Sequence, residues 1–347
     1  MKSFVSIIFK GDSMKTVRLI FLVSLLLVAF SKTSLLGDTN NCTGWVSPLY
    51  CPYMCDNDGH TFGMDAFSSI EGALSYLSYL SSCEKVTLYV KGINIAYSDS
   101  IDGDLHINGG RLTISGQNGL TVTGDVYLDG DAELIGGDLI VDGTFVFVNS
   151  ILTIGDNNLI TGGFQNSGPG HYVKTDGAGQ VSTSTSTQGT LVPVGNSGDG
   201  YTPVVIQPND GGAVFAVKSE EDPTFRDQDA NAVGVGWQVT PPEGFQGQAT
   251  VSFVYPKSSC PPGFNPATAV VYHYHNGHWI PLPNCTTQEW PENNNYWITT
   301  APNITQFSPF GISSDGVIPV FKFWHFAIAG AILVLIGAAF VYRRFVA

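Results

Sequence analysis

A seven-residue pattern recurs three times in the middle of the chain, at residues 103–109, 124–130 and 137–143. Each copy reads Gly-Asp, then alternating apolar and variable residues, then Asp or Asn and Gly, which is the chemistry of a short strand between turns. The first two copies begin 21 residues apart, about one coil of a solenoid with three short strands per coil. We therefore expect a β-solenoid at residues 85–167. Its coils should stack six apolar residues in one buried column: Leu105, Ile107, Val126, Leu128, Leu139 and Val141.

Further short strands fill the gaps between the copies and support this interpretation. They are expected at residues 111–115, 120–123, 132–135, 144–149, 151–154 and 158–161. An antiparallel meander would use the same turn residues, so it remains the alternative arrangement. An open solenoid end would expose unpaired backbone groups. The segment before the repeat is expected to cover this end as a cap. Asp65 is expected to begin a helix reaching about Ser82, with one apolar stripe formed by Phe67, Ile70, Leu74 and Leu77.

A strand at residues 86–91 follows that helix. The two segments, Phe-Ser-Ser-Ile-Glu-Gly-Ala-Leu at residues 67–74 and Lys-Val-Thr-Leu-Tyr-Val at residues 85–90, resemble the start of right-handed parallel β-helix proteins of the pectate-lyase type. The resemblance implies an all-β fold with an N-terminal capping helix. It also raises the hypothesis of a polysaccharide lyase or hydrolase.

Such enzymes need paired carboxylates, or calcium with a basic residue, in a cleft with long loop walls. The turns here are only two or three residues long, and Arg111 is the one basic residue within the repeat. Turn chemistry already accounts for the acidic candidates. These are Asp102, Asp104, Asp125, Asp129, Asp131, Asp138 and Asp142. We therefore expect no enzyme, while calcium binding by the Asp-rich turns stays open without an assigned site.

From about residue 168 the strands become longer and Pro and Gly connect them. Strands are expected at residues 190–194, 202–207, 213–218, 234–240, 248–255, 269–275, 278–282 and 296–300. This pattern without helical periodicity predicts a β-sandwich at residues 168–315. Its core should contain Trp237, Phe253, Tyr272, Trp279 and Trp297.

Four short phrases in this region are similar to a module of large surface proteins of the Bacteroidota. They are Gly-His-Tyr-Val-Lys-Thr-Asp-Gly at residues 170–177, Val-Pro-Val-Gly at 192–195, Tyr-Thr-Pro-Val at 201–204 and Ile-Thr-Gln-Phe-Ser-Pro-Phe at 304–310. In that family the module often follows solenoid-like repeats and precedes a C-terminal sorting domain. The usual secretion β-domain is missing here. The tail, with Ile318-Pro319-Val320, an apolar segment and Arg343-Arg344, instead resembles tails processed by exosortase-type enzymes.

Both ends of the chain indicate export. Residues 1–37 contain a basic stretch from Met14 to Arg18 and an apolar stretch typical of a signal peptide. Residues 316–347 contain an apolar run that begins at Phe323 and ends at Tyr342, long enough to cross a bilayer. The arginines after it should remain inside, so the body would lie outside, anchored by one span. Whether a sorting peptidase removes this span, or it remains permanently, is left open.

The net charge of the body restricts the classes of partner that it can bind. Between residue 38 and the tail there are seven basic and twenty-eight acidic residues. Such a surface repels phosphate backbones, so we expect no nucleic-acid partner. It attracts divalent cations, which is consistent with calcium outside the cell.

The six cysteines all lie in the exported body, where disulfides are the expected state. Residues 38–84 form a disulfide-rich cap containing Cys42, Cys51, Cys55 and Cys83, for which zinc is the alternative. Cys260 and Cys285 are expected to pair with each other.

Other candidate sites are weaker. Asn41, Asn284 and Asn303 begin N-x-[ST] glycosylation sequences. Trp290 and Trp297 could stack on sugar rings or belong to the core. His273, His275 and His278 have a spacing that a metal could use, although no metal is assigned.

These features predict a cell-surface structural or adhesive protein that presents a rigid, acidic, β-rich ectodomain. A carbohydrate-binding surface protein is the first alternative, and a β-helix polysaccharide lyase or hydrolase is the second. A eukaryotic single-pass glycoprotein is the third.

Overall fold

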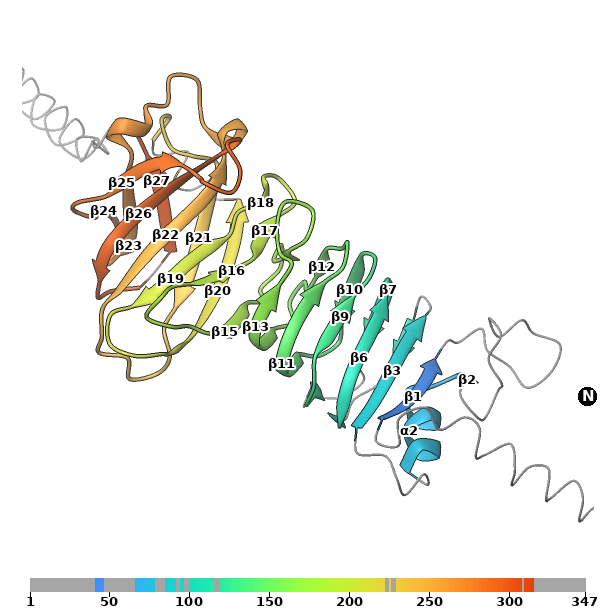
Figure 1. The fold of residues 1–347 in the computed structure, drawn as a ribbon. Coiled ribbons are helices and arrows are strands. Elements are labelled where there is room, and N and C mark those ends of the chain that lie inside the picture. Colours follow the sequence, from blue (N-terminus) through green and yellow to red (C-terminus); the bar gives the residue numbers. More distant parts are fainter. Residues whose placement is uncertain are drawn as a thin grey trace, which may run out of the picture.

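The computed structural model describes residues 41–46, 66–78, 85–91, 94–96, 100–114, 119–221, 225, 229–307 and 309–314. These residues form an all-β fold with one α-helix (Figure 1). Within this part of the chain, no helix is both long and apolar enough to cross a membrane. The signal peptide region and the apolar run from Phe323 lie outside the described residues.

The N-terminal end of the fold combines three strands with the helix. Strand β1 (Asn41–Val46) pairs in parallel with β3 (Lys85–Lys91) on one side and with the two-residue β2 (Ala66–Phe67) on the other. Helix α2 (Ile70–Ser78) buries Ile70, Ala73 and Leu77 against the end of this sheet. The expected helix is therefore present but begins later, and Phe67 belongs to β2 instead of the helix.

A β-solenoid of about five turns follows. Every strand from β3 to β13 pairs in parallel with the strand one coil away, so the antiparallel meander is wrong. The strands are β4 (Asn94–Ala96), β5 (Ser100–Ile101), β6 (Gly103–Asn108), β7 (Gly110–Thr113), β8 (Leu120–Val122), β9 (Val126–Leu128), β10 (Ala132–Ile135), β11 (Leu139–Phe147), β12 (Leu152–Thr153) and β13 (Leu159–Gln165).

Three faces surround the interior of the solenoid. The first contains β1, β3, β6, β9 and the ends of β11 and β13; the second contains β4, β7, β10 and β12. The third contains β5, β8 and the beginnings of β11 and β13. Alternate residues of each strand point inward, since successive side chains of a strand face opposite sides.

The six apolar residues of the repeat are all buried, but they do not form one column. Leu105 and Ile107 stack on Val126 and Leu128, and Phe145 and Phe147 continue these two columns on the first face. Leu139 and Val141 instead stack on Leu120 and Val122 on the third face. The third copy begins 13 residues after the second, which is less than one coil, so it occupies a different face.

Parallel pairing continues beyond residue 167. Strand β14 (Val173–Lys174) stacks on β12, β15 (Val181–Ser184) stacks on β13, and β17 (Val194–Asn196) stacks on β14. The boundary that we placed at residue 168, from which longer strands were expected, therefore falls within the last coils. We use "the solenoid" for the coils from β3 to β17, without β16.

The rest of the described chain forms two antiparallel sheets, here called the two-sheet body. One contains β16 (Thr190–Val192), β19 (Val204–Pro208), β22 (Ala249–Pro256), β25 (Thr286–Glu289) and β26 (Tyr296–Ile304). The other contains β20 (Val214–Glu221), β21 (Val235–Thr240), β23 (Val270–His275), β24 (His278–Pro281) and β27 (Pro309–Ser313). Two 3₁₀ turns, η1 (Lys257–Ser259) and η2 (Pro266–Thr268), connect strands, and β18 (Gly200–Tyr201) pairs with β17.

Aromatic rings fill the space between the two sheets, which is the arrangement of a β-sandwich. Phe253 of β22 lies 5.1 Å from Trp237 of β21 and 5.2 Å from Phe310 of β27, measured between ring centroids. Trp237, Phe253 and Tyr272 are fully buried, as expected of core residues. Trp279 and Trp297 are only partly buried.

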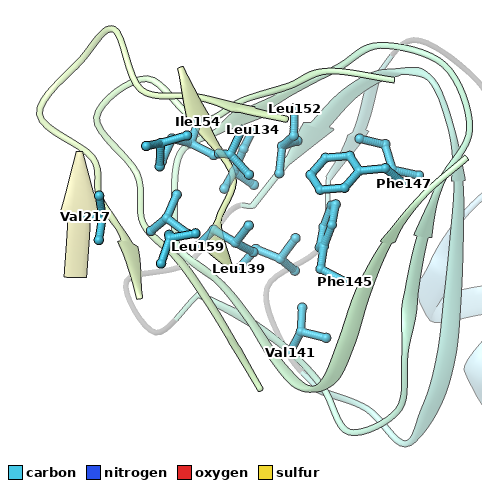
Figure 2. Packing of buried hydrophobic residues seen from close by; sticks show 14 of the residues in the cluster. Leu134, Leu139, Val141, Phe145, Phe147, Leu152, Ile154, Leu159 and Val217 are labelled. Atoms are coloured by element: carbon cyan, nitrogen blue, oxygen red, sulfur yellow. The ribbon is translucent and has the colours of Figure 1, made fainter. Parts of the chain in front are cut away.

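The third face of the solenoid runs directly into the two-sheet body. Strand β15 pairs in parallel with β13 on one edge and antiparallel with β20 on the other, with Val181 opposite Val217. Figure 1 shows the resulting series of strands extending from the coils into the body without a break. The apolar interior is also shared: in Figure 2, Val217 of β20 lies beside Leu159, in the same cluster as Phe145 and Phe147.

Candidate functional site

Most of the acidic candidates of the repeat hold neighbouring coils together. Asp125 accepts a hydrogen bond from the backbone N–H of Thr144 (2.8 Å), and Asp131 accepts one from Ile151 (2.8 Å). Asp104 accepts one from the backbone of Asp125 (2.8 Å). In each case the donor lies 19–21 residues later, one coil along. These carboxylates therefore satisfy backbone groups at the corners of the solenoid, where no strand partner is available.

Asp138 has the most extensive contacts of this set. It accepts hydrogen bonds from the backbone N–H of Asn158 (2.7 Å) and from its side-chain amide (3.1 Å and 3.2 Å). Asn158 in turn accepts one from the backbone of Gln180 (3.0 Å), so one corner is linked across three coils. Asp102 contributes differently, since it accepts a hydrogen bond from the hydroxyl of Thr123 (3.0 Å).

We expect Asp138→Ala to lower the free energy of unfolding by about 1–2 kcal/mol, because hydrogen bonds to a charged group are lost. Asp138→Asn keeps an acceptor and should lose less. Asp142→Ala removes the same charge from an exposed position and should change stability by less than about 0.5 kcal/mol. Urea unfolding followed by circular dichroism measures all three. Equal losses for Asp138→Ala and Asp142→Ala would show that net charge, and not the hydrogen bonds, sets the effect.

An aromatic ladder runs along the outside of the first face, and sequence analysis missed it. It contains Trp45, Tyr89, His106 and Tyr127, one from each of four successive strands. Neighbouring rings stack with centroids 4.3 Å apart at each step. Because the ring faces cover one another, mostly ring edges are left for solvent. Burial lowers the pKa of His106, while the charge of Asp104 opposes that shift.

A second aromatic cluster joins the end of the solenoid to the two-sheet body. Trp290, with 5% of its surface exposed, packs with Tyr201 (5.9 Å between centroids) and Tyr296 (5.7 Å). Tyr172 from the solenoid packs on Tyr201 at 5.8 Å. We call these four residues the aromatic clasp. Trp290 is thus a packing residue, and its ring is not available for the sugar stacking that was one of its two expected roles.

Trp297 is the more accessible of the two candidate tryptophans. It is partly buried, and the amino group of Lys257 lies 4.3 Å from its ring centroid, a cation–π contact. Lys257 also forms an ion pair with Glu289. A sugar could reach this ring face only after displacing Lys257.

The three candidate histidines do not converge on one point. His273 is buried, His275 is half-buried and His278 is exposed, on strands β23 and β24. The rings of His273 and His275 are 6.0 Å apart, and burial together with His275 lowers the pKa of His273. Over the described ranges, no three His, Cys, Asp or Glu side chains form a group able to hold a metal ion.

The expected bridge between Cys260 and Cys285 is wrong: both are free thiols in the structure. The sulfur of Cys285 lies 3.4 Å from the carbonyl oxygen of Leu282, and that of Cys260 lies 4.0 Å from that of Pro256. Each thiol therefore points to a carbonyl of its own turn. Cys42 is disulfide-bonded, whereas Cys51, Cys55 and Cys83 lie outside the described residues.

Both free thiols should react slowly with alkylating reagents. Burial raises the pKa of Cys260 to about 12 and also raises that of Cys285. Because only the thiolate is nucleophilic, we expect Cys260 to react at pH 8 about a hundredfold or more slowly than an unperturbed thiol. Mass spectrometry after timed iodoacetamide treatment measures the rate, and the unfolded chain in urea is the control. Equal rates for the folded and unfolded chain would contradict this expectation.

Two of the three glycosylation sequences are accessible. Asn284 and Asn303 are exposed, and both adopt positive φ angles (59° and 56°). Asn41 lies in β1, but its side chain is outside the part of the chain that the structure describes.

The junction between the solenoid and the two-sheet body contains a buried hydrogen-bond network centred on Ser219 of β20. The hydroxyl of Thr175 donates to the carbonyl of Ser219 (2.8 Å) and accepts from its N–H (3.0 Å). The hydroxyl of Ser219 contacts that of Thr202 (2.6 Å) and accepts from the side-chain amide of Asn196 (3.1 Å). The indole N–H of Trp237 donates to the carbonyl of Thr202 (2.9 Å). All five residues are at most 1% exposed.

This junction network connects segments far apart in the sequence. Thr175 and Asn196 come from the last coils, whereas Ser219 and Trp237 belong to the two-sheet body. A buried polar group without a partner is costly, so rotating the two parts against each other would break several hydrogen bonds at once. The junction network, the aromatic clasp and the β15–β20 pairing therefore fix one relative orientation.

Comparisons of the chain with protein-family models, with curated proteins and with solved structures find no match.

Proposed function

We propose that this protein is a cell-surface structural or adhesive protein whose function is to hold a rigid, acidic, β-rich ectodomain away from the membrane. The β-solenoid is compatible with this role. The observation that carries the proposal is the continuity of the fold: parallel coils pass into antiparallel sheets through a shared sheet, a shared apolar interior and the junction network. A stiff support needs such a connection, whereas two functional modules could be joined by a linker.

The proposal includes export and anchoring. The signal-like residues 1–37 and the apolar run from Phe323 support a single-pass topology with the body outside. The likeness of the tail to substrates of exosortase-type enzymes supports a sorting peptidase as a partner. The phrases shared with Bacteroidota surface proteins support the same compartment.

The two rival functions gain less support from the geometry. For carbohydrate binding, Trp290 is enclosed in the aromatic clasp and Trp297 lies under Lys257. For a lyase or hydrolase, Asp125 and its neighbours already bind backbone amides of the next coil. The proposed role is therefore non-enzymatic.

The test uses cells that produce the full chain and cells that lack it. We expect protease added to intact cells to cut the body, and loss of the chain to reduce attachment of the cells to surfaces or to one another. Restoring the wild-type chain should restore attachment. A chain that depolymerises uronate polymers, or a body that stays protected inside intact cells, would overturn the proposal. Binding to a glycan array that is lost in Trp297→Ala would favour the carbohydrate-binding alternative.

A further inference from the structure

The aromatic ladder gives the outer surface of the first face a character that the other two faces lack. Its four side chains alternate with buried residues of their strands, so they point away from the interior. The strand segments that the structure describes in the second and third faces contain no aromatic residue. Val146 of β11 follows Tyr127 in the same row. One outward row of rings, closed by a valine, thus crosses the five neighbouring strands β1, β3, β6, β9 and β11 (Figure 1).

Acidic and polar side chains flank this row on both sides, two positions away along each strand. On one side Asp104 and Asp125 lie in successive coils, joined by the hydrogen bond from the N–H of Asp125 to the carboxylate of Asp104 (2.8 Å). On the other side Lys91, Asn108 and Asp129 follow one another. Asp129 is exposed, whereas the side chain of Lys91 lies outside the described part of the chain. Because the whole body carries seven basic and twenty-eight acidic residues, a cationic ligand is favoured over a neutral or anionic one.

The spacing of the rings restricts the kind of ligand that fits. Neighbouring strands of a sheet lie about 4.7–4.9 Å apart, so the ladder repeats at this distance along the solenoid. An extended peptide advances only about 3.3 Å per residue and would lose its register within a few coils. Sugars in a β-1,4-linked chain advance by nearly the coil spacing, and alternate units are turned over. Their substituents therefore project alternately to the two sides of the chain, which is where the two flanking rows lie.

We propose that the aromatic ladder is the binding surface for a linear β-1,4-linked polysaccharide that carries free amino groups. Each sugar lies across the ring edge of one coil, and its protonated amine pairs with a carboxylate of one of the two flanking rows. This surface is separate from Trp290 and Trp297, which belong to the two-sheet body. The proposal rests on the adhesive role proposed above and names the ligand for that role.

Titration of the purified full chain in detergent tests this proposal. The probe is a fluorescently labelled glucosamine pentasaccharide, one sugar for each strand of the row, at mildly acidic pH and low salt. We expect saturable binding that weakens with added salt, since charge pairing contributes to it. Cellopentaose, which has the same linkage without amines, should bind at least about tenfold more weakly. Acetylated pentalysine, which has the same number of amines at peptide spacing, should also bind at least about tenfold more weakly.

Two variants locate the site. Tyr127→Ala removes a ring from the row and should weaken binding about tenfold. Asp129→Asn removes an exposed flanking charge and should weaken binding about threefold. The matched control Asp210→Asn removes one exposed charge from the two-sheet body and should bind as the wild type does. Thermal unfolding of each sample detects a loss of fold, and if Tyr127→Ala unfolds, the comparison of Asp129→Asn with Asp210→Asn decides.

The proposal is overturned if the pentasaccharide does not bind, or if cellopentaose or pentalysine binds as tightly. It is equally overturned if folded Tyr127→Ala and Asp129→Asn both bind as the wild type does. Such a failure leaves the surface role standing, because protease accessibility and attachment of cells are measured without this ligand. Protection of the body inside intact cells would overturn the surface role, but it would not change the binding of the purified chain.

Discussion

Replacing Gly103 by alanine should destabilise the solenoid by about 3 kcal/mol or more, because the added methyl group has no space. Gly103 has a φ angle of 147°, and a Cβ built on it would lie 1.8 Å from the carbonyl oxygen of Val86. Val86 is the direct partner of Gly103 in the neighbouring strand β3. The clash is with backbone, so it can be relieved only by moving two coils apart. Urea unfolding followed by far-UV circular dichroism measures the loss.

Gly163→Ala is the matched control for this experiment. Gly163 also lies in a solenoid strand, β13, but a Cβ there would meet no atom within 4 Å. We expect its free energy of unfolding to change by less than about 0.5 kcal/mol. If Gly103→Ala were as stable as Gly163→Ala, β3 and β6 could not be packed as closely as described.

Trp237→Ala should lower the free energy of unfolding by about 3–5 kcal/mol, an effect comparable with that of Gly103→Ala. Trp237 is fully buried and packs between the two sheets of the body. Its removal would leave a cavity and would also leave the carbonyl of Thr202 without the indole donor. Calorimetry and urea unfolding of the same sample measure the change.

Trp237→Phe separates these two contributions. The phenyl ring refills most of the cavity but cannot donate a hydrogen bond to the carbonyl of Thr202. The free energy of unfolding of this variant should therefore be about 1–3 kcal/mol lower than that of the wild type. Trp297→Ala, at a partly exposed position, should lose less than Trp237→Ala. A ranking in which Trp297→Ala is the most damaging variant would contradict the assignment of Trp237 to the centre of the body.

The sequence predicted the strands well where period-two alternation is bounded by Gly, Asn and Asp. The strand expected at residues 132–135 appears with the same bounds as β10, and the antiparallel strands expected from residue 202 onward correspond to β19–β24 and β26. Local alternation shows which residues of a strand point to the same side, but it does not show which face of the solenoid the strand joins. For this reason Leu139 and Val141 were placed in the wrong column.

The junction could not be predicted from the sequence, because it depends on contacts between distant segments. Thr175 and Ser219 are 44 residues apart, and neither lies in a recognisable motif. The burial of Trp290 has the same origin, since Tyr201, which packs on it, lies far away in the sequence. The aromatic ladder, in contrast, could have been recognised in the sequence, because His106 and Tyr127 occupy the same position in two copies of the repeat.

The central claim is that the solenoid and the two-sheet body form one rigid unit without a hinge. Double electron–electron resonance on the full chain tests it directly, with spin-labelled unnatural amino acids at Val148 in the solenoid and Ile280 in the body. Both side chains are exposed (52% and 39%), so the labels should not disturb the core. We predict a single narrow distance distribution that is unchanged between low and high salt. A broad or two-peaked distribution would show that the junction bends and would contradict the account.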